Sequence, residues 1–321
     1  MQRREFLKNG ASLLSLFPLI NTGLFNAKLF GCSMNEDVVR MKVGAISCTL
    51  FRDTMFKYLG KDYFINASAD EVNNALSKFG ATADNIPSPF IAVLLQHKDR
   101  KVLIDTGVGF MEKPVEFKGK TLKFEGRLKH LLLRENISNE DITDVVITHF
   151  HPDHIGGVYA GGHLNFPNAQ FHMHEAEWSY WHSGQSDNQS PAFRYFIETQ
   201  ITPLKKQNIN LFKGDFVEIL PGITAVQAQG HTPGQVALII HSDDKRLLYA
   251  SDAFLHPLHI ERLDWQTSYD MDHQTAKQSR IKLLDLAYQE NMHINAFHFD
   301  FPGLGRVDKC KNGWHWNYSN K

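Results

Sequence analysis

The sequence predicts a single α/β domain, on three grounds. The chain has 321 residues, 42% hydrophobic and 21% charged, which is a globular composition and enough for one large domain. Short apolar runs rich in β-branched residues, typical of strands, alternate with segments of helical spacing. No internal repeat, low-complexity stretch or linker interrupts them. Periodicity alone does not give the order of the layers.

The charge balance argues against a nucleic-acid partner. There are 34 basic and 35 acidic residues, whereas nucleic-acid-binding surfaces usually show a basic excess or stripe. Three cysteines, Cys32, Cys48 and Cys310, are too few for a disulfide framework. At most Cys48 and Cys310 pair once, and the sequence leaves this open.

The first 32 residues resemble an export signal. Gln2–Lys8 reads Gln-Arg-Arg-Glu-Phe-Leu-Lys, like a twin-arginine signal, and the apolar region 11–25 after it is too short and interrupted for a spanning helix. The segment 29–32 resembles a lipoprotein cleavage box, with Cys32 as the lipidated first residue. The alternative is an amphipathic start to the domain. We expect a mature domain at 33–321, exported to the periplasm or anchored to a membrane as a lipoprotein.

The segment after the leader predicts three strands and two helices. The strands are expected at Met41–Leu50, Phe90–Gln96 and Arg100–Ile104, and the helices at Asp70–Lys78 and Phe124–Glu135. Pro87-Ser88-Pro89 reads as a breaker. Asp105 follows the third strand and opens a glycine turn, which is a position suited to a turn-forming carboxylate.

The most informative stretch follows the apolar run Asp144–Thr148, which reads as a buried strand. Three imidazoles and one carboxylate fall within six residues: His149, His151, Asp153 and His154. Pro152 cannot extend a strand ladder and Gly156-Gly157 permits a sharp turn, so these side chains lie on a loop at a strand end.

This spacing predicts metal binding. Residues two apart on an extended backbone face the same way, so His149 and His151 can bind one ion together. Asp153 and His154 lie past the bend and can face a second ion. Polar groups gathered away from water are costly unless they are paired or bind a metal. Imidazole and carboxylate suit zinc, with manganese, iron or cobalt as alternatives.

The rest of the chain repeats the arrangement of a ligand-type residue after an apolar strand. Such residues are His231, Asp252 and His298, each at a turn. The aromatic residues between Trp178 and Phe196 are either core or an apolar pocket wall. Strands are expected at Ala169–His174, Asp215–Ile219, Thr224–Gln227, Gln235–His241, Arg246–Ala250 and Ile294–His298, and helices at Glu175–His182, Ala192–Lys206 and Thr275–Tyr288.

The pattern His-x-His-x-Asp-His at 149–154 resembles the motif of the metallo-β-lactamase superfamily. The resemblance implies an αββα sandwich with two zinc ions at one edge of the two sheets. Carried over position by position, it implies one metal on His149, His151 and His231, a second on Asp153, His154 and His298, and Asp252 as a bridge.

This ligand set implies a two-metal hydrolase. Two cations ~3.5–4 Å apart can share a hydroxide and polarise a carbonyl or phosphoryl oxygen. Asp153 is the expected catalytic residue, which holds the second metal and also carries a proton to the leaving group. In the superfamily, the residue at the position of Asp105 lies near the metals and orients a ligand.

The segments 251–258, 264–265 and 298–305 resemble the N-acyl homoserine lactonases and the methyl parathion hydrolase-like enzymes. Many of these lactonases carry a tyrosine shortly after the bridging aspartate, but here no side chain at 253–255 is a donor. His256 is therefore either the replacement donor or a structural histidine. Further candidates for ligand support or the substrate pocket are Phe150, Phe254 and Phe301.

The predicted function is the opening of N-acyl homoserine lactones by a dinuclear zinc site. The alternatives are an organophosphate or aryl-ester hydrolase on the same scaffold and a non-catalytic metal-binding protein. The expected partner is a small lactone or ester. The sequence leaves open whether apolar faces of the aromatic insertion pack within one chain or form a homodimer.

Overall fold

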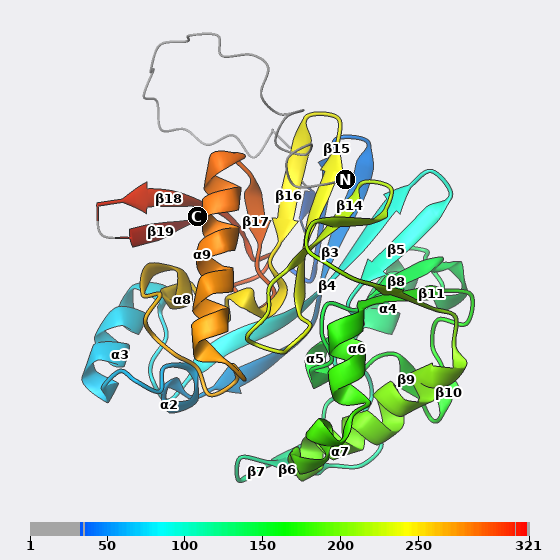
Figure 1. Ribbon diagram of the computed structural model, residues 1–321, viewed down its shortest axis with the longest axis horizontal. Helices are drawn as coiled ribbons and strands as arrows, with labels where there is room; N and C mark the ends of the chain where they lie inside the picture. Colours follow the sequence, from blue (N-terminus) through cyan, green and yellow to red (C-terminus); the bar gives the residue numbers. More distant parts are fainter. Residues whose placement is uncertain (1–32, 35, 312, 320–321) are drawn as a thin grey trace.

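The computed structural model describes residues 33–319 except 35 and 312. Two sheets pack face to face, and helices cover the outer face of each (Figure 1). The predicted export signal and Cys32 lie outside the described residues. Within them, no helix has the length and apolar character needed to cross a membrane.

The first sheet has eight strands in the order β1-β2-β3-β4-β5-β8-β11-β12. Strands β2 to β5 are antiparallel neighbours, whereas β5, β8, β11 and β12 run parallel. The bounds are β1 Ser33–Met34, β2 Val38–Val43, β3 Ile46–Tyr58, β4 Ile86–His97, β5 Arg100–Ile104, β8 Asp144–Val146, β11 Gln170–His174 and β12 Ile209–Phe212.

The second sheet has seven strands in sequential order, β13 to β19. Only the β16–β17 pair is parallel, and α9 connects these two strands. The bounds are β13 Val217–Leu220, β14 Ile223–Gln227, β15 Val236–Ser242, β16 Lys245–Tyr249, β17 His293–Asn295, β18 Leu304–Cys310 and β19 Gly313–Tyr318.

The helices and two small hairpins surround these sheets. The hairpins are β6 (Val115–Phe117) with β7 (Lys120–Leu122), and β9 (Tyr159–Ala160) with β10 (His163–Leu164). The helices are α2 Gly60–Tyr63, α3 Ala69–Leu76, α4 Leu128–Arg134, α5 Pro152–Ile155, α6 Glu175–Trp181, α7 Pro191–Phe196, α8 Leu258–Glu261 and α9 His273–Gln289.

Three apolar clusters account for the layer order. The central cluster joins the inner faces of the two sheets, for example Val93 of β4 with Leu238 of β15. A second cluster seals the outer face of the first sheet with α4 and α6, and a third packs Leu283 and Leu284 of α9 on the second sheet. Burying one face of each amphipathic layer against the next produces the predicted αββα sandwich, which is confirmed.

The expectation of a breaker at Pro87-Ser88-Pro89 was wrong. Pro87 and Pro89 do not interrupt β4 but lie inside it, opposite Lys57 and Met55 of β3. This half of β4 has only one neighbour, because β5 pairs with it only from Val93 onward, and an edge tolerates residues without an N–H.

Cys48 and Cys310 do not form a disulfide with each other. Cys48 is buried on β3 of the first sheet, and Cys310 is exposed at the end of β18 in the second.

Candidate metal centre

The seven predicted ligand residues all follow strand ends, at one edge of the sandwich. His149 and His151 leave β8, and α5, which begins at Pro152 as a proline-started turn, carries the next two. The others lie in the turns after β14, β16 and β17. The structure brings together all seven: His149, His151, Asp153, His154, His231, Asp252 and His298.

These side chains form two groups that share Asp252. Within each group the candidate ligand atoms lie within 4.8 Å of one another, and every member is buried. His231 Nε2 is 2.8 Å from His151 Nδ1 in the first group. In the second, Nε2 of His298 and of His154 each lie 3.1 Å from a different oxygen of Asp252. One carboxylate therefore faces both groups.

The donor set fits two metal ions. Nε2 of His149, Nε2 of His154 and Oδ1 of Asp252 are buried without a hydrogen-bond partner. An unsatisfied buried polar atom costs about 1–3 kcal/mol, and a cation in each group would satisfy all three. Imidazole nitrogen and carboxylate oxygen are ligands typical of zinc and other divalent transition metals.

Asp105 orients one ligand and forms a turn at the same time. Its φ of 56° is in the left-handed region, which aspartate tolerates better than most residues. One carboxylate oxygen contacts His154 Nδ1 at 2.8 Å and accepts from the Tyr249 hydroxyl at 2.8 Å. The other accepts from the Thr148 amide at 2.9 Å. This contact leaves His154 Nε2 facing the centre.

Two further ligands have supporting residues that the sequence analysis missed. His231 Nδ1 contacts the buried Asp270 at 3.1 Å, and Arg280 from α9 donates to the same carboxylate at 2.7 Å. His298 Nδ1 contacts the Ser88 hydroxyl at 3.0 Å. No local sequence motif predicts these partners, because each comes from a distant part of the chain.

Burial and hydrogen bonding set different protonation tendencies among the histidines. Burial lowers the pKa of His149 and His151 well below the usual value, so both are neutral and able to bind a cation. Burial also acts to lower the pKa of His231, but hydrogen bonds to Asp252 and Asp270 outweigh it and raise the pKa to about 9. Metal binding at His231 therefore displaces a proton at neutral pH.

The two carboxylates of the centre titrate in opposite directions. Burial acts to raise the pKa of Asp252, but His298 and His154 overcome it and hold this pKa well below the usual range. Burial raises the pKa of Asp153, which the same two histidines only partly oppose. Asp252 is thus the persistent anion, and Asp153 is the carboxylate that more readily takes a proton.

A family model described as the metallo-beta-lactamase superfamily matches residues 92–289, more than half of the chain. The chain belongs to the metallo-beta-lactamase superfamily. As a hydrolase of this superfamily, it carries the complete set of ligand-type residues that the motif at 149–154 led us to expect.

Named relatives include two N-acyl homoserine lactonases. One, from Bacillus sp., is 26% identical over 168 residues, which is 48% of this chain and 59% of the relative. The other, from Bacillus cereus, is 24% identical over 200 residues, or 59% of this chain and 73% of the relative. The match thus spans less than two thirds of the first relative's length.

Two solved structures share the fold across most of the chain. One is AidC, a dizinc quorum-quenching lactonase in complex with a product, with a TM-score of 0.74 and 24% identity over 88% of this chain and 97% of AidC. The other is the hydrolase AbOPH, with a TM-score of 0.77 and 21% identity over 89% and 98% of the two chains. These identities establish a common fold.

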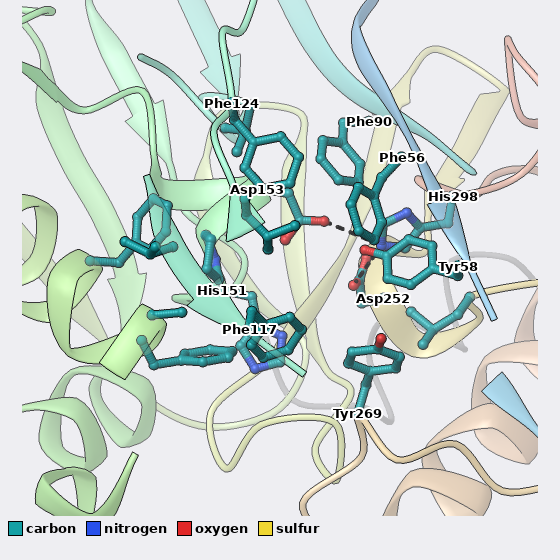
Figure 2. Close-up of a pocket in the computed structure, with 18 of the residues that line it drawn as sticks. Phe56, Tyr58, Phe90, Phe117, Phe124, His151, Asp153, Asp252, Tyr269 and His298 are labelled. Carbon is teal, nitrogen blue, oxygen red and sulfur yellow. Dashed lines mark hydrogen bonds and ion pairs between the residues drawn. The ribbon is translucent and has the colours of Figure 1, made fainter. Parts of the chain in front are cut away.

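A pocket opens above both ligand groups of this superfamily hydrolase. Asp153, Asp252 and His298, which form the polar floor of the pocket, lie close together in Figure 2 with aromatic side chains around them. These side chains come from the end of β3, from β4, from the β6–β7 hairpin and its flank, from α7 and from the loop before α9: Phe56, Tyr58, Phe90, Phe117, Phe124, Phe193, Phe196 and Tyr269. The ligand-type residues therefore lie at the floor of the pocket, and its walls are mostly aromatic.

The aromatic residues between Trp178 and Phe196 were expected to form either core or a pocket wall, and the structure shows both. Phe193 and Phe196 of α7 line the pocket, and Phe193 meets Phe117 of the hairpin with ring centroids 6.0 Å apart. Trp178 and Trp181 instead pack into the cluster beneath the first sheet. One face of the insertion thus builds the wall and the other builds core.

Four predicted pocket or support residues lie elsewhere. Phe150 and Phe254 are fully buried in the outer clusters of the first and second sheets. Phe301 packs on the central cluster, with the Arg52 guanidinium 5.7 Å from its ring centroid. His256 does not line the pocket; its Nδ1 accepts from the Leu258 amide at 3.2 Å, as a structural histidine would.

Tyr58 and Tyr269 bring hydroxyl groups to the pocket, whereas no side chain at 253–255 is a donor. Both line the pocket, and Figure 2 shows the hydroxyl of Tyr269 turned toward Asp252. Burial raises the pKa of both phenols above the usual value, so each remains a donor at neutral pH.

Proposed function

We propose that this protein is a two-metal lactonase that opens N-acyl homoserine lactones. The observation that carries the proposal is the pocket, whose polar floor holds both ligand groups and whose walls are aromatic and aliphatic. Such a site suits a small polar ring attached to a hydrocarbon chain. The relatives named as lactonases, including the dizinc AidC, support the same substrate class.

In this proposal His149, His151 and His231 hold the first ion, and Asp153, His154 and His298 hold the second. Asp252 faces both. Two zinc ions held there would polarise the lactone carbonyl and bring the pKa of water near ~7, so that a nucleophile forms at neutral pH. All seven side chains are buried, and five of them line the pocket: His151, Asp153, His231, Asp252 and His298.

Asp153 is the proposed proton carrier. It lines the pocket, its Oδ2 lies 3.4 Å from His298 Nε2, and burial raises its pKa. Oδ2 can take the proton released when the nucleophile forms and return it to the ring oxygen as the lactone opens. An Asp153→Asn variant that keeps both metals and full turnover would contradict this role.

Tyr58 and Tyr269 are the proposed donors to the substrate. Their hydroxyls lie on the side of the pocket that also holds Asp252 and His298, and both remain protonated. One donates to the lactone carbonyl and the other to the amide of the acyl chain. They replace the missing tyrosine from different elements, β3 and the loop before α9.

The aromatic wall is the proposed binding surface for the acyl chain. Val115, Leu122, Phe193 and Phe196 offer apolar contacts that extend away from the floor. Each methylene removed from water contributes about 0.8 kcal/mol. Longer chains should therefore bind more tightly until they leave the pocket.

An aryl phosphotriester or aryl ester is the second candidate substrate, because the aromatic wall suits an aryl group as well as an alkyl chain. The deciding experiment compares hydrolysis of a long-chain N-acyl homoserine lactone with that of a phosphotriester by zinc-reconstituted protein. Asp252→Ala serves as the inactive control. Faster lactone opening supports the proposal, and the reverse ranking keeps the two-metal centre but changes the substrate.

Export is proposed as well, on the basis of the leader at 1–32. A twin-arginine pathway carries folded proteins, which suits an enzyme that acquires its metal before leaving the cytoplasm. Mass spectrometry of exported protein should show that the leader is absent, with lipid on Cys32 if the lipoprotein cleavage box is used. Intact leader in exported material would contradict this.

A further inference from the structure

Glu177 is a buried acidic residue that neither ligand group includes. It lies in α6 and is 0% exposed. Its carboxylate accepts four hydrogen bonds, two on each oxygen. Oε1 accepts from the Phe150 amide at 2.9 Å and the Trp181 indole at 2.6 Å, and Oε2 accepts from the Thr232 hydroxyl at 2.7 Å and the Gly234 amide at 2.9 Å.

Three of these donors belong to the two loops that carry the first ligand group. Phe150 stands between His149 and His151, and Thr232 and Gly234 lie one and three positions after His231. Oε1 therefore holds one ligand loop and Oε2 holds the other. A single carboxylate spans the gap between segments that are some 80 positions apart in the chain, as the separation of His151 and His231 shows.

Close packing reinforces the connection. A Cβ at Gly234 would lie 2.0 Å from the Glu177 amide nitrogen, so only glycine lets this loop come so near to α6. Phe150 and Thr232 are fully buried on either side. The two loops are therefore packed closely around Glu177.

The contacts also limit what Glu177 can do. Both oxygens are already occupied by donors, so the carboxylate has no free lone pair aimed at the centre and serves as neither ligand nor base. Four donors around one carboxylate favour its ionised form, but they only partly oppose burial, which raises the pKa of Glu177. The energy of these hydrogen bonds depends on the loops keeping their positions.

We propose that Glu177 is a positioning residue that sets the spacing of His149, His151 and His231, and that the first metal site depends on it. This inference rests on the proposed two-metal function. The second group has its own supports, because Asp105 contacts His154 and Ser88 contacts His298. Loss of the Glu177 charge should therefore weaken one of the two sites selectively.

The test is Glu177→Gln, with Glu175→Gln as the matched control. Glutamine keeps the size of the side chain but presents an amide NH₂ to one pair of donors, so one loop loses its acceptor. Glu175 lies in the same helix but faces Lys213 at the surface, 2.8 Å away. Removing a residue that supports metal ligands typically weakens metal affinity about 10–100-fold.

The readout is metal binding without substrate: zinc per chain after dialysis, and absorbance during cobalt titration. We expect E177Q to keep one tightly bound metal and to bind the other about 10–100-fold more weakly, whereas E175Q binds two like the wild type. Equal affinity of E177Q and wild type for both metals would overturn the inference. So would equal weakening of both sites, which is what a general loss of stability predicts.

A milder variant decides the matter if E177Q does not fold. Thr232→Val removes only the hydroxyl donor to Oε2 and should weaken one metal about tenfold. Unchanged affinity in T232V would then refute the role of Glu177. These outcomes are separate from the substrate question, because no turnover is measured. Failure of the wild type to bind two metals would instead refute the proposed function.

Discussion

A substitution of His256 tests whether this histidine, which follows the predicted ligand Asp252 in sequence, has a structural role. It is 7% exposed, and its ring packs edge-on against Phe79 and Phe64, with centroids 4.9 and 5.8 Å away. Burial lowers its pKa to about 3, with a smaller contribution from Lys78. The informative change is His256→Asn, because asparagine can still accept from the Leu258 amide but cannot titrate.

The magnitude follows from the difference between the native pKa and the unfolded value of about 6.5. As pH falls, the unfolded chain binds a proton at His256 before the native protein does. Stability is therefore unaffected above pH ~6.5 and is lost progressively between ~6.5 and ~3. At pH 5 the loss amounts to about 2 kcal/mol, from 1.5 pH units at about 1.36 kcal/mol each.

The assay is urea unfolding at pH 7.5 and pH 5.0. All samples contain a chelator, so that no sample holds metal at either pH and loss of metal at low pH does not affect the comparison. The wild type should lose about 2 kcal/mol more than H256N between the two pH values. His163→Asn, at an exposed position of β10, controls for removal of an imidazole. Equal pH dependence of the wild type and H256N would refute the reasoning. A large loss of lactone turnover in stable H256N would make His256 a substrate donor after all.

Three further outcomes are expected. Tyr269→Phe should lower kcat about 100-fold while both metals remain bound, since a preorganised donor to the reacting oxygen is lost; unchanged kcat would exclude Tyr269 as a donor. Phe193→Ala should raise KM about tenfold for a long acyl chain and much less for a short one, and equal effects on both would place the chain elsewhere. Removing metal with a chelator should lower Tm, and zinc should restore it, because the seven buried ligand residues lose their partner; a Tm that does not respond would argue against resident ions.

Much of the candidate centre could be predicted because its ligands occupy positions determined locally. His149, His151, Asp153 and His154 come from one loop, whose shape depends on Pro152 and the glycines after it. The strand Arg100–Ile104 coincides with β5, since its apolar run is bounded by polar residues on both sides. Ligand residues at strand ends meet at one edge of the sheets once the strands pair, so the order of strands is enough to gather them.

The supporting residues could not be predicted in this way. Asp270 reaches His231 only because the loop before α9 folds back over the turn after β14. Ser88 reaches His298 from a segment that two prolines mark as a breaker, and only the edge position of that half of β4 allows it to be a strand. Both contacts depend on pairing between segments far apart in the chain, which no local spacing records.

The pocket shows why a ligand motif identifies chemistry better than substrate. Tyr58 faces the centre because β3 continues to that residue, whereas the sequence pattern predicted a strand ending at Leu50. The aromatic residues expected to matter, Phe150 and Phe254, lie one and two positions from a predicted ligand in sequence but belong to the outer clusters. Phe150 stands between His149 and His151, and immediate neighbours on an extended backbone face opposite sides, so its side chain points away from the centre. We expect the residues that select the substrate to be those that distant elements bring to the pocket. Tyr269 and Phe193 are the first of these to examine.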